Sequence, residues 1–330
     1  MILLKHKLIF ADFEVFKEDW LLLAIDYNTK KEIVICNDRN KLIRFYELLN
    51  KTNSILVFFN GRQYDQWIFK AIVKNMNPYR VSIGLIEEGK KGYQLIPKHY
   101  EVPLVFFDCM TGVNGLKTLE SFLGLDIKES DVSFDLDRKL TTDELKDTVD
   151  YCRKDVLATI EVFEHSKEEF DSVMGLIEMF ELPLEYLSKT KAQLSSTILG
   201  AKRPEKDRND EWDIELPENL IINKYKDVVE WFLSEKIREP NAKYEREVVG
   251  VKHTFALGGI HGSTIKSRYE GDYIACWDVQ SLYPSTIIEY DLMSRNVEDG
   301  NKYREIRDLR IKLKNEGDSR QAPLKIVLID

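Results

Sequence analysis

The sequence predicts an α/β protein with a layered N-terminal domain, and three observations lead to that prediction. Ser54 to Phe59 is a continuous apolar run, which is typical of a buried strand. It ends at Asn60-Gly61, and the apolar spacing then predicts an amphipathic helix from about Tyr64 to Lys74. Ahead of this unit, the segment from Lys7 to about Cys36 predicts a hairpin or meander. Strand, turn and helix in alternation indicate an α/β layer domain.

The first predicted strand carries two acids. Asp12 and Glu14 stand two residues apart inside the apolar run from Leu8 to Phe16. In a strand this spacing places both side chains on the same face. Two like charges in a strand interior need compensation, which a divalent cation would supply. The alternative is an edge strand whose acids face solvent, and that arrangement needs no metal.

Three more elements follow before residue 165. Leu104 to Asp108 is a predicted strand, and Gly115 to Gly124 is a short helix that ends at its second glycine. Thr141 or Thr142 caps a longer helix that continues to about Phe163. This helix places Tyr151 and Asp155 four residues apart on one face. Such a pair is also common on ordinary helix surfaces.

The remainder of the chain is predicted to be more irregular. The segment from His165 to about Lys252 is largely helical and charged, with a linker-like stretch from Ala201 to Pro217. Gly258-Gly259 favours either a tight turn or a close approach by another backbone. Asp278 is predicted at a strand end, just before a sharp turn into a helix. An acid facing a helix start can hold a metal and a polyphosphate together.

The bulk composition leaves several function classes open. The 330 residues suffice for two domains and an incomplete third, and 43% hydrophobic with 32% charged residues is ordinary for a globular protein. No apolar run approaches the roughly 18 residues of a membrane span, and no signal-peptide pattern is present. The four scattered cysteines form no CxxC pair, which favours a reducing compartment without a structural zinc. The net charge of −9 does not exclude nucleic acid, because a basic groove can coexist with an acidic exterior.

Taken in order, these stretches resemble the motifs of family B DNA polymerases, particularly the compact phage type. Asp12-Phe-Glu14 resembles the first exonuclease motif, Asn60 with Tyr64-Asp65 the second, and Tyr151-Cys-Arg-Lys-Asp155 the third. Four further matches extend the resemblance toward residue 325. They are Thr118-Leu119 with Phe122 (the single-strand ligand motif), Lys128 (a lysine that assists exonucleolysis), Gly258-Gly259 (the motif linking the two modules) and Asp278 to Pro284 (the polymerase metal motif).

The resemblance implies a domain layout and a first activity. Residues 1–165 would form a ribonuclease-H-like exonuclease domain, 166–254 a mostly helical connector, and 255–330 an incomplete palm with the first fingers helices. The first domain would remove nucleotides from single-stranded 3′ ends with two Mg²⁺ or Mn²⁺ ions. The residues it implies are the metal ligands Asp12, Glu14, Asp65 and Asp155, the water-positioning Tyr151 and Lys128, and the DNA-gripping Asn60, Tyr64, Thr118, Leu119 and Phe122, with Gly258 and Gly259 also on DNA.

On the polymerase side, the resemblance makes Asp278 one of two metal-binding aspartates. The nucleotide would be held by Val279, Ser281, Leu282 and Tyr283 together with Arg310, Lys314 and Lys325. The last three also fit a solvated basic helix face. The family motif with the second catalytic aspartate, and the thumb, are missing from this sequence. We therefore expect the N-terminal part of a polymerase, active in synthesis with dNTPs only when a separately encoded C-terminal half completes it.

Three functional hypotheses follow. The chain is a proofreading exonuclease joined to an incomplete polymerase, or a non-catalytic DNA-binding fragment that docks onto its C-terminal half, and these two are compatible. A stand-alone nuclease is disfavoured because residues after 250 would then have no role. The expected location is the cytoplasm (the host cytoplasm for a phage protein), with no membrane partner. Exposed sheet edge and apolar surface in the incomplete palm predict poor solubility without a partner.

Overall fold

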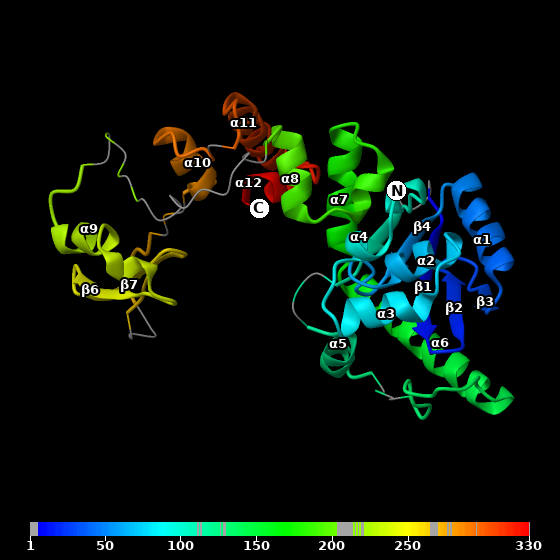
Figure 1. Ribbon diagram of the computed structural model, residues 1–330. Helices are drawn as coiled ribbons and strands as arrows, with labels where there is room; N and C mark the ends of the chain where they lie inside the picture. The colour runs from blue at the N-terminus through cyan, green and yellow to red at the C-terminus, as the bar shows by residue number, and fades with distance from the viewer. Residues whose placement is uncertain are drawn as a thin grey trace. The chain divides into compact units, whose positions relative to one another are not determined.

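The computed structural model describes residues 6–110, 112, 114–125, 127, 130–202, 214, 216, 218, 221–264, 270–275, 277, 279–294 and 296–329. The chain divides into two compact units, Met1–Leu194 and Ser195–Asp330, which are described separately (Figure 1).

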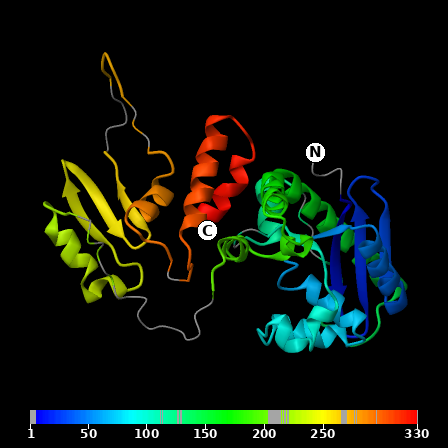
Figure 2. The same cartoon turned by 90° about the horizontal axis from the view of Figure 1, so that it is seen from above.

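The first unit is built on a five-stranded mixed sheet with the order β3-β2-β1-β4-β5. Its strands are β1 (Leu8–Val15), β2 (Trp20–Asp26), β3 (Glu32–Cys36), β4 (Ile55–Phe58) and β5 (Phe106–Asp108). The first three form an antiparallel meander, and they lie side by side in blue in Figure 2. β4 and β5 join in parallel on the other side of β1. The predicted α/β class and the predicted meander are confirmed.

Helices connect and cover these strands. They are α1 (Arg39–Lys51), α2 (Asp65–Val73), α3 (Pro78–Ile86), α4 (Gly92–Leu95), α5 (Leu116–Leu123), α6 (Thr142–His165) and α7 (Lys167–Met179), with short 3₁₀ turns η2 (His99–Glu101) and η3 (Leu184–Ser188). Local signals set two of the ends. Thr141 caps α6 in a reciprocal capping box with Glu144, and Gly124 ends α5 at a φ of +70°.

The two faces of β1 pack against different helices. Ile9, Ala11 and Phe13 belong to one core cluster together with buried residues of α1 and α2. Phe10, on the opposite face, meets Phe163 of α6 edge-on with the ring centroids 5.2 Å apart. Because side chains alternate along a strand, Asp12 and Glu14 share the face that α6 covers. The sequence prediction that both acids lie on one face is confirmed.

The second unit contains a three-stranded antiparallel sheet in the order β6-β7-β8. Its described elements are α9 (Lys226–Phe232), η4 (Glu235–Arg238), β6 (Tyr244–Val248), β7 (Val251–Ala256), β8 (Gly259–Gly262), α10 (Leu282–Glu289), α11 (Asn301–Asn315) and α12 (Gln321–Ile329), while α8 (Lys191–Leu199) straddles the boundary between the units. β6 and the start of β7 fall in the segment predicted to be helical, and the sheet continues past residue 254, where the resemblance placed a boundary.

The strand expected before Asp278 is a second difference. The described residues from Tyr273 to Val279 belong to no strand. The side chains of Tyr273 and Trp277 are 97% and 92% exposed. A strand needs a neighbour to accept its backbone hydrogen bonds, and none of the described residues pairs with this segment. Asp278 itself lies outside the described residues.

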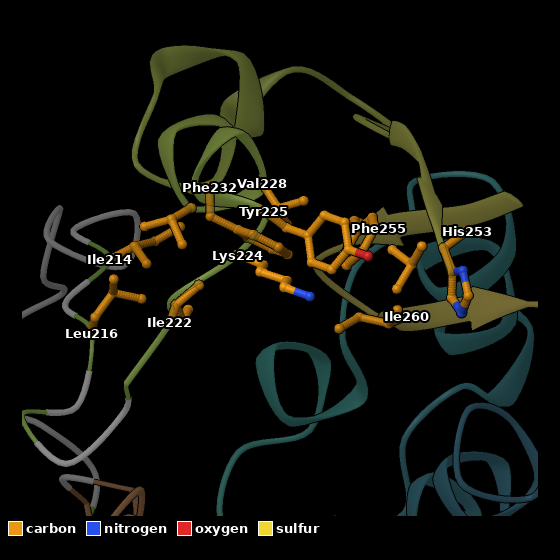
Figure 3. Close-up of a pocket in the computed structure, with 12 residues that line it drawn as sticks. Ile214, Leu216, Ile222, Lys224, Tyr225, Val228, Phe232, His253, Phe255 and Ile260 are labelled. Atoms are coloured by element: carbon orange, nitrogen blue, oxygen red, sulfur yellow. The ribbon is translucent and has the colours of Figure 1, made fainter. Parts of the chain in front are cut away.

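An apolar pocket of about 620 Å³ lies in the second unit, where α9 faces the sheet. Figure 3 shows side chains of the helix and of the strands converging on it. The lining residues are Ile214, Leu216, Ile222, Lys224, Tyr225, Val228, Val229, Phe232, Val248, His253, Phe255 and Ile260. Within the described part of the chain, no helix combines the length and the hydrophobicity that a membrane crossing requires.

Candidate metal centre

The centre of the candidate site is the contact between β1 and α6. The Cys152 thiol lies 3.5 Å from Asp12 Oδ2 and 3.7 Å from the Asp12 carbonyl oxygen. One ligand atom each from Asp12, Glu14 and Cys152 lies within 4.8 Å of the others. α6 packs on the face of β1 that carries both acids, and Glu14 is only 7% exposed, so the alternative of acids that face solvent does not hold. Glu14 is buried and Asp12 is half-buried between the strand and the helix.

Asp65 reaches the same place from the start of α2. Pairing between β1 and β4 stops at Phe10 opposite Val57. Beyond that point the amide of Phe13 donates to Asp65 Oδ1 at 3.3 Å. Asp65 is only 2% exposed. A carboxylate therefore takes the hydrogen bond that a neighbouring strand would otherwise accept, which fixes the side chain of Asp65 beside β1.

Asp108, at the end of β5, holds the turn that leads to Asp65. Its carboxylate accepts from the backbone amides of Asn60 at 2.9 Å, Arg62 at 2.8 Å and Met110 at 3.0 Å. Asn60 adopts a left-handed conformation with φ +65°. At Gly61, a Cβ would come within 2.5 Å of the Phe58 Cβ, so the turn admits only glycine there without a shift.

α6 and α5 supply the remaining charged groups. Asp155 accepts a hydrogen bond from the Lys117 amine at 2.7 Å, and burial followed by the charge of Asp155 raises the pKa of Tyr151. The same Lys117 amine lies 5.0 Å from the centre of the Tyr151 ring. Lys117 thus brings the first turn of α5 next to the acids, and it is the cation whose attraction offsets part of their repulsion.

The acids raise one another's pKa values. Burial, followed by the charge of Asp155, raises the pKa of Asp12 to about 7. Burial and then the charges of Asp12, Asp155 and Asp65 hold the pKa of Glu14 well above its usual range. Burial, Asp12 and Asp108 do the same to the pKa of Asp65. Without a cation, these neighbouring carboxylates cannot all be ionised at the same time. A bound divalent cation would stabilise their ionised forms.

The donor set fits a hard divalent ion. Asp12, Glu14, Asp65 and Asp155 offer carboxylate oxygens, the ligands that Mg²⁺ and Mn²⁺ prefer. Asp12 and Glu14 come from β1, Asp65 from α2 and Asp155 from α6. In each pair among Asp12, Glu14 and Asp155, the charge of one acid raises the pKa of another. The predicted residues of three separate motifs therefore meet in one place within the first unit.

The residues predicted to bind DNA differ in how exposed their side chains are. Phe122 on α5 is 74% exposed, and Thr118 is exposed while Leu119 is half-buried. Tyr64 is different, because its ring packs against the core and its hydroxyl lies 2.9 Å from the Ser82 hydroxyl. Stacking of a base on Tyr64 would require that contact to open. Lys128 lies outside the described residues.

In the second unit, four of the predicted nucleotide-binding residues (Val279, Ser281, Leu282 and Tyr283) lie at the start of α10, and Arg310 reaches them from α11. Arg310 of α11 donates to the Ser281 hydroxyl at 3.1 Å. Val279, Leu282 and Tyr283 are exposed. Lys314 and Lys325 are exposed as well, on α11 and α12. Gly258 lies in the turn before β8, and Gly259 has a φ of +151°, a conformation that favours glycine.

Three residues of the site were missed by the sequence analysis. Cys152 stands inside the third motif, Lys117 directly precedes Thr118, and Asp108 ends a predicted strand. An acid at the end of an apolar strand was the available signal for Asp108. Nothing in the local sequence indicates that the other two reach the acids of β1 and α6.

Comparison with models of protein families found no match, and no curated protein sequence proved similar to this chain.

Replacing one buried acid should stabilise the metal-free protein. We expect Asp12→Asn to raise the free energy of unfolding at pH 8, in the presence of a chelator, by on the order of 1 kcal/mol. The folded pKa of Asp12, about 7, exceeds its usual 3.8, so the destabilisation by this group develops between pH 3.8 and 7 and is complete above pH 7. The gain should therefore shrink as the pH falls from 8 toward 4. Urea denaturation across this range measures it.

Asp26→Asn is the matched control with the opposite sign. Burial alone would raise the pKa of Asp26, but the Lys7 amine at 2.6 Å and the amides of Thr29 and Asn28 lower it. The free energy of unfolding of this variant should be about 1 kcal/mol lower than that of the wild-type chain at pH 8. A destabilised Asp12→Asn protein under the same conditions would contradict the assignment of a strained acid cluster.

Proposed function

We propose that the first unit is a metal-dependent 3′→5′ exonuclease acting on single-stranded DNA ends. The observation that carries the proposal is that Asp12 and Glu14 present ligand atoms within 4.8 Å of each other, while the charges of Asp65 and Asp155 act on Glu14. Hydrolysis of a phosphodiester by two ions needs such a set of carboxylates. The fold proposed for the unit is ribonuclease-H-like, consistent with its central acid-bearing strand and mixed sheet.

The roles of the residues follow from their contacts. Two divalent ions, when bound, would supply the charge that activates water and stabilises the leaving oxygen. Asp12 and Glu14 would hold these ions from β1, Asp65 from α2 and Asp155 from α6. The Tyr151 hydroxyl, whose pKa is raised by burial and by the charges of Asp155 and Glu14, would orient a water beside the cluster. Lys117 neutralises Asp155 until an ion takes over that role.

Single-stranded DNA is the proposed substrate because of what borders the acids. α5 packs against α6 and carries Lys117 in its first turn. It carries the exposed ring of Phe122, on which a base can stack, and the exposed hydroxyl of Thr118. A paired end would have to unpair before its terminal phosphodiester reached the buried carboxylates.

We further propose that the whole chain is the N-terminal part of a family B DNA polymerase. The contact between Arg310 and Ser281 supports a nucleotide site at the start of α10. The exposed aromatic side chains of Tyr273, Trp277 and Tyr283 support docking of a partner on the second unit. Primer extension with dNTPs should appear only when the family's C-terminal polymerase half is added. Extension by this chain alone, or no association with that half, would contradict the proposal.

The nuclease proposal is tested by removing the acids of β1. The double variant Asp12→Ala/Glu14→Ala should lose degradation of 5′-labelled single-stranded DNA by at least about 1000-fold, because the ions lose two ligands. Gel electrophoresis in Mg²⁺ resolves the products. Glu18→Ala, an exposed acid just beyond β1, is the matched control and should keep full activity. Degradation that survives the double substitution would refute the site.

Tyr151→Phe tests the role of the hydroxyl. The ring and its contact with Lys117 remain, but the hydroxyl that would position the water is lost, so single-turnover cleavage should slow by about 10- to 100-fold. Mg²⁺ binding and thermal stability should change little. Tyr93→Phe, a substitution at an exposed tyrosine of α4, serves as the control. An unaltered cleavage rate in Tyr151→Phe would rule out a role in positioning water.

A further inference from the structure

The donor set at the centre contains a sulfur as well as oxygens. The Cys152 thiol points at Asp12, 3.5 Å from Oδ2, and its sulfur belongs to the group of ligand atoms lying within 4.8 Å of one another. Cys152 and the two acids come from different elements, α6 and β1. A thiolate is a ligand that Mg²⁺ avoids and that soft or borderline ions prefer.

Glu14 gives an independent indication that a cation belongs here. Its side chain is 7% exposed and its carboxylate lies in the same group of atoms as Cys152. No described residue donates a hydrogen bond to it. A buried carboxylate without a donor is unfavourable unless a cation approaches it. An additional cation would therefore stabilise the cluster of Asp12, Glu14 and Cys152.

The spacing suits a tetrahedral ion. With Zn–S of about 2.3 Å, Zn–O of about 2.1 Å and a tetrahedral angle, sulfur and oxygen ligands stand roughly 3.6 Å apart. The 3.5 Å between Cys152 Sγ and Asp12 Oδ2 matches that value without movement of either side chain. The widest pair in the group, at up to 4.8 Å, needs to close by about an ångström. Rotation of the Glu14 side chain can supply that change.

We propose that Asp12, Glu14 and Cys152 form a binding site for thiophilic divalent ions such as Zn²⁺ and Cd²⁺. On binding, the S–H bond breaks, its proton passes to the buffer, and a sulfur–metal bond forms without electron transfer. The regulatory consequence rests on the proposed nuclease function. An ion held through Cys152 occupies the carboxylates that Mg²⁺ needs, so zinc inhibits cleavage at this site.

The site is tested by titrating the full chain with CdCl₂ and recording the thiolate-to-Cd²⁺ charge-transfer absorption in the ultraviolet. The wild-type chain should show a band that saturates, and Mg²⁺ alone should produce none. C152S should lose the band and bind Cd²⁺ at least about 10-fold more weakly, as expected when a metal site loses a partner. D12N keeps the thiol and should also bind Cd²⁺ more weakly, which guards against misfolding of C152S.

C109S is the matched control, because Cys109 is also buried and directly follows the buried acid Asp108. C109S and C36S should retain the band. A band that persists in C152S, or its absence from the wild-type chain, would overturn the proposal. Nuclease assays on the same samples separate the two claims. A Cd²⁺ band without any cleavage would support the thiol site and contradict the proposed nuclease function. Mg²⁺-dependent cleavage without a band would support the nuclease function and contradict the thiol site.

Discussion

Burial of like charges in the middle of a sheet is the constraint around which the first unit is arranged. Asp12 and Glu14 lie on the face of β1 that α6 covers, so neither carboxylate can turn fully to solvent. Their burial raises the pKa of each, and the charge of Asp155 adds to the effect. A sheet with apolar residues at these positions would be more stable. Acids at these positions lower the stability of the fold, as residues of functional sites often do.

The surrounding elements hold the acids in place without neutralising them completely. Asp65 is fixed by the amide of Phe13, and the turn before it is fixed by Asp108, so the start of α2 cannot move away from β1. α6 contributes Asp155 and Cys152 from adjacent turns, while Lys117 is drawn in from α5. Lys117 forms an ion pair with Asp155, and the two acids of β1 keep raised pKa values. An additional cation bound beside these acids would stabilise their ionised forms.

Local sequence patterns predicted the parts of this site that depend on local geometry. The two-residue spacing of Asp12 and Glu14 placed them on one face, and Thr141, one of the two predicted caps, marks the start of α6. The β6–β7 hairpin was missed for a physical reason. Its turn, Val249-Gly250, has positive φ at both residues, a conformation that valine rarely adopts and that Asn-Gly would have signalled. The contacts of Lys117 and Cys152 with the acids depend on how α5 and α6 pack, which no local pattern encodes.

The central claim is that carboxylates from β1, α2 and α6 form one site for divalent ions. The most direct measurement is anomalous diffraction from crystals of the full chain grown with Mn²⁺. The account predicts anomalous peaks within ligand distance of Asp12, Glu14, Asp65 and Asp155, roughly 2.0–2.3 Å from their oxygens. Crystals with Mn²⁺ bound elsewhere, and with these four side chains free of any ion, would contradict it.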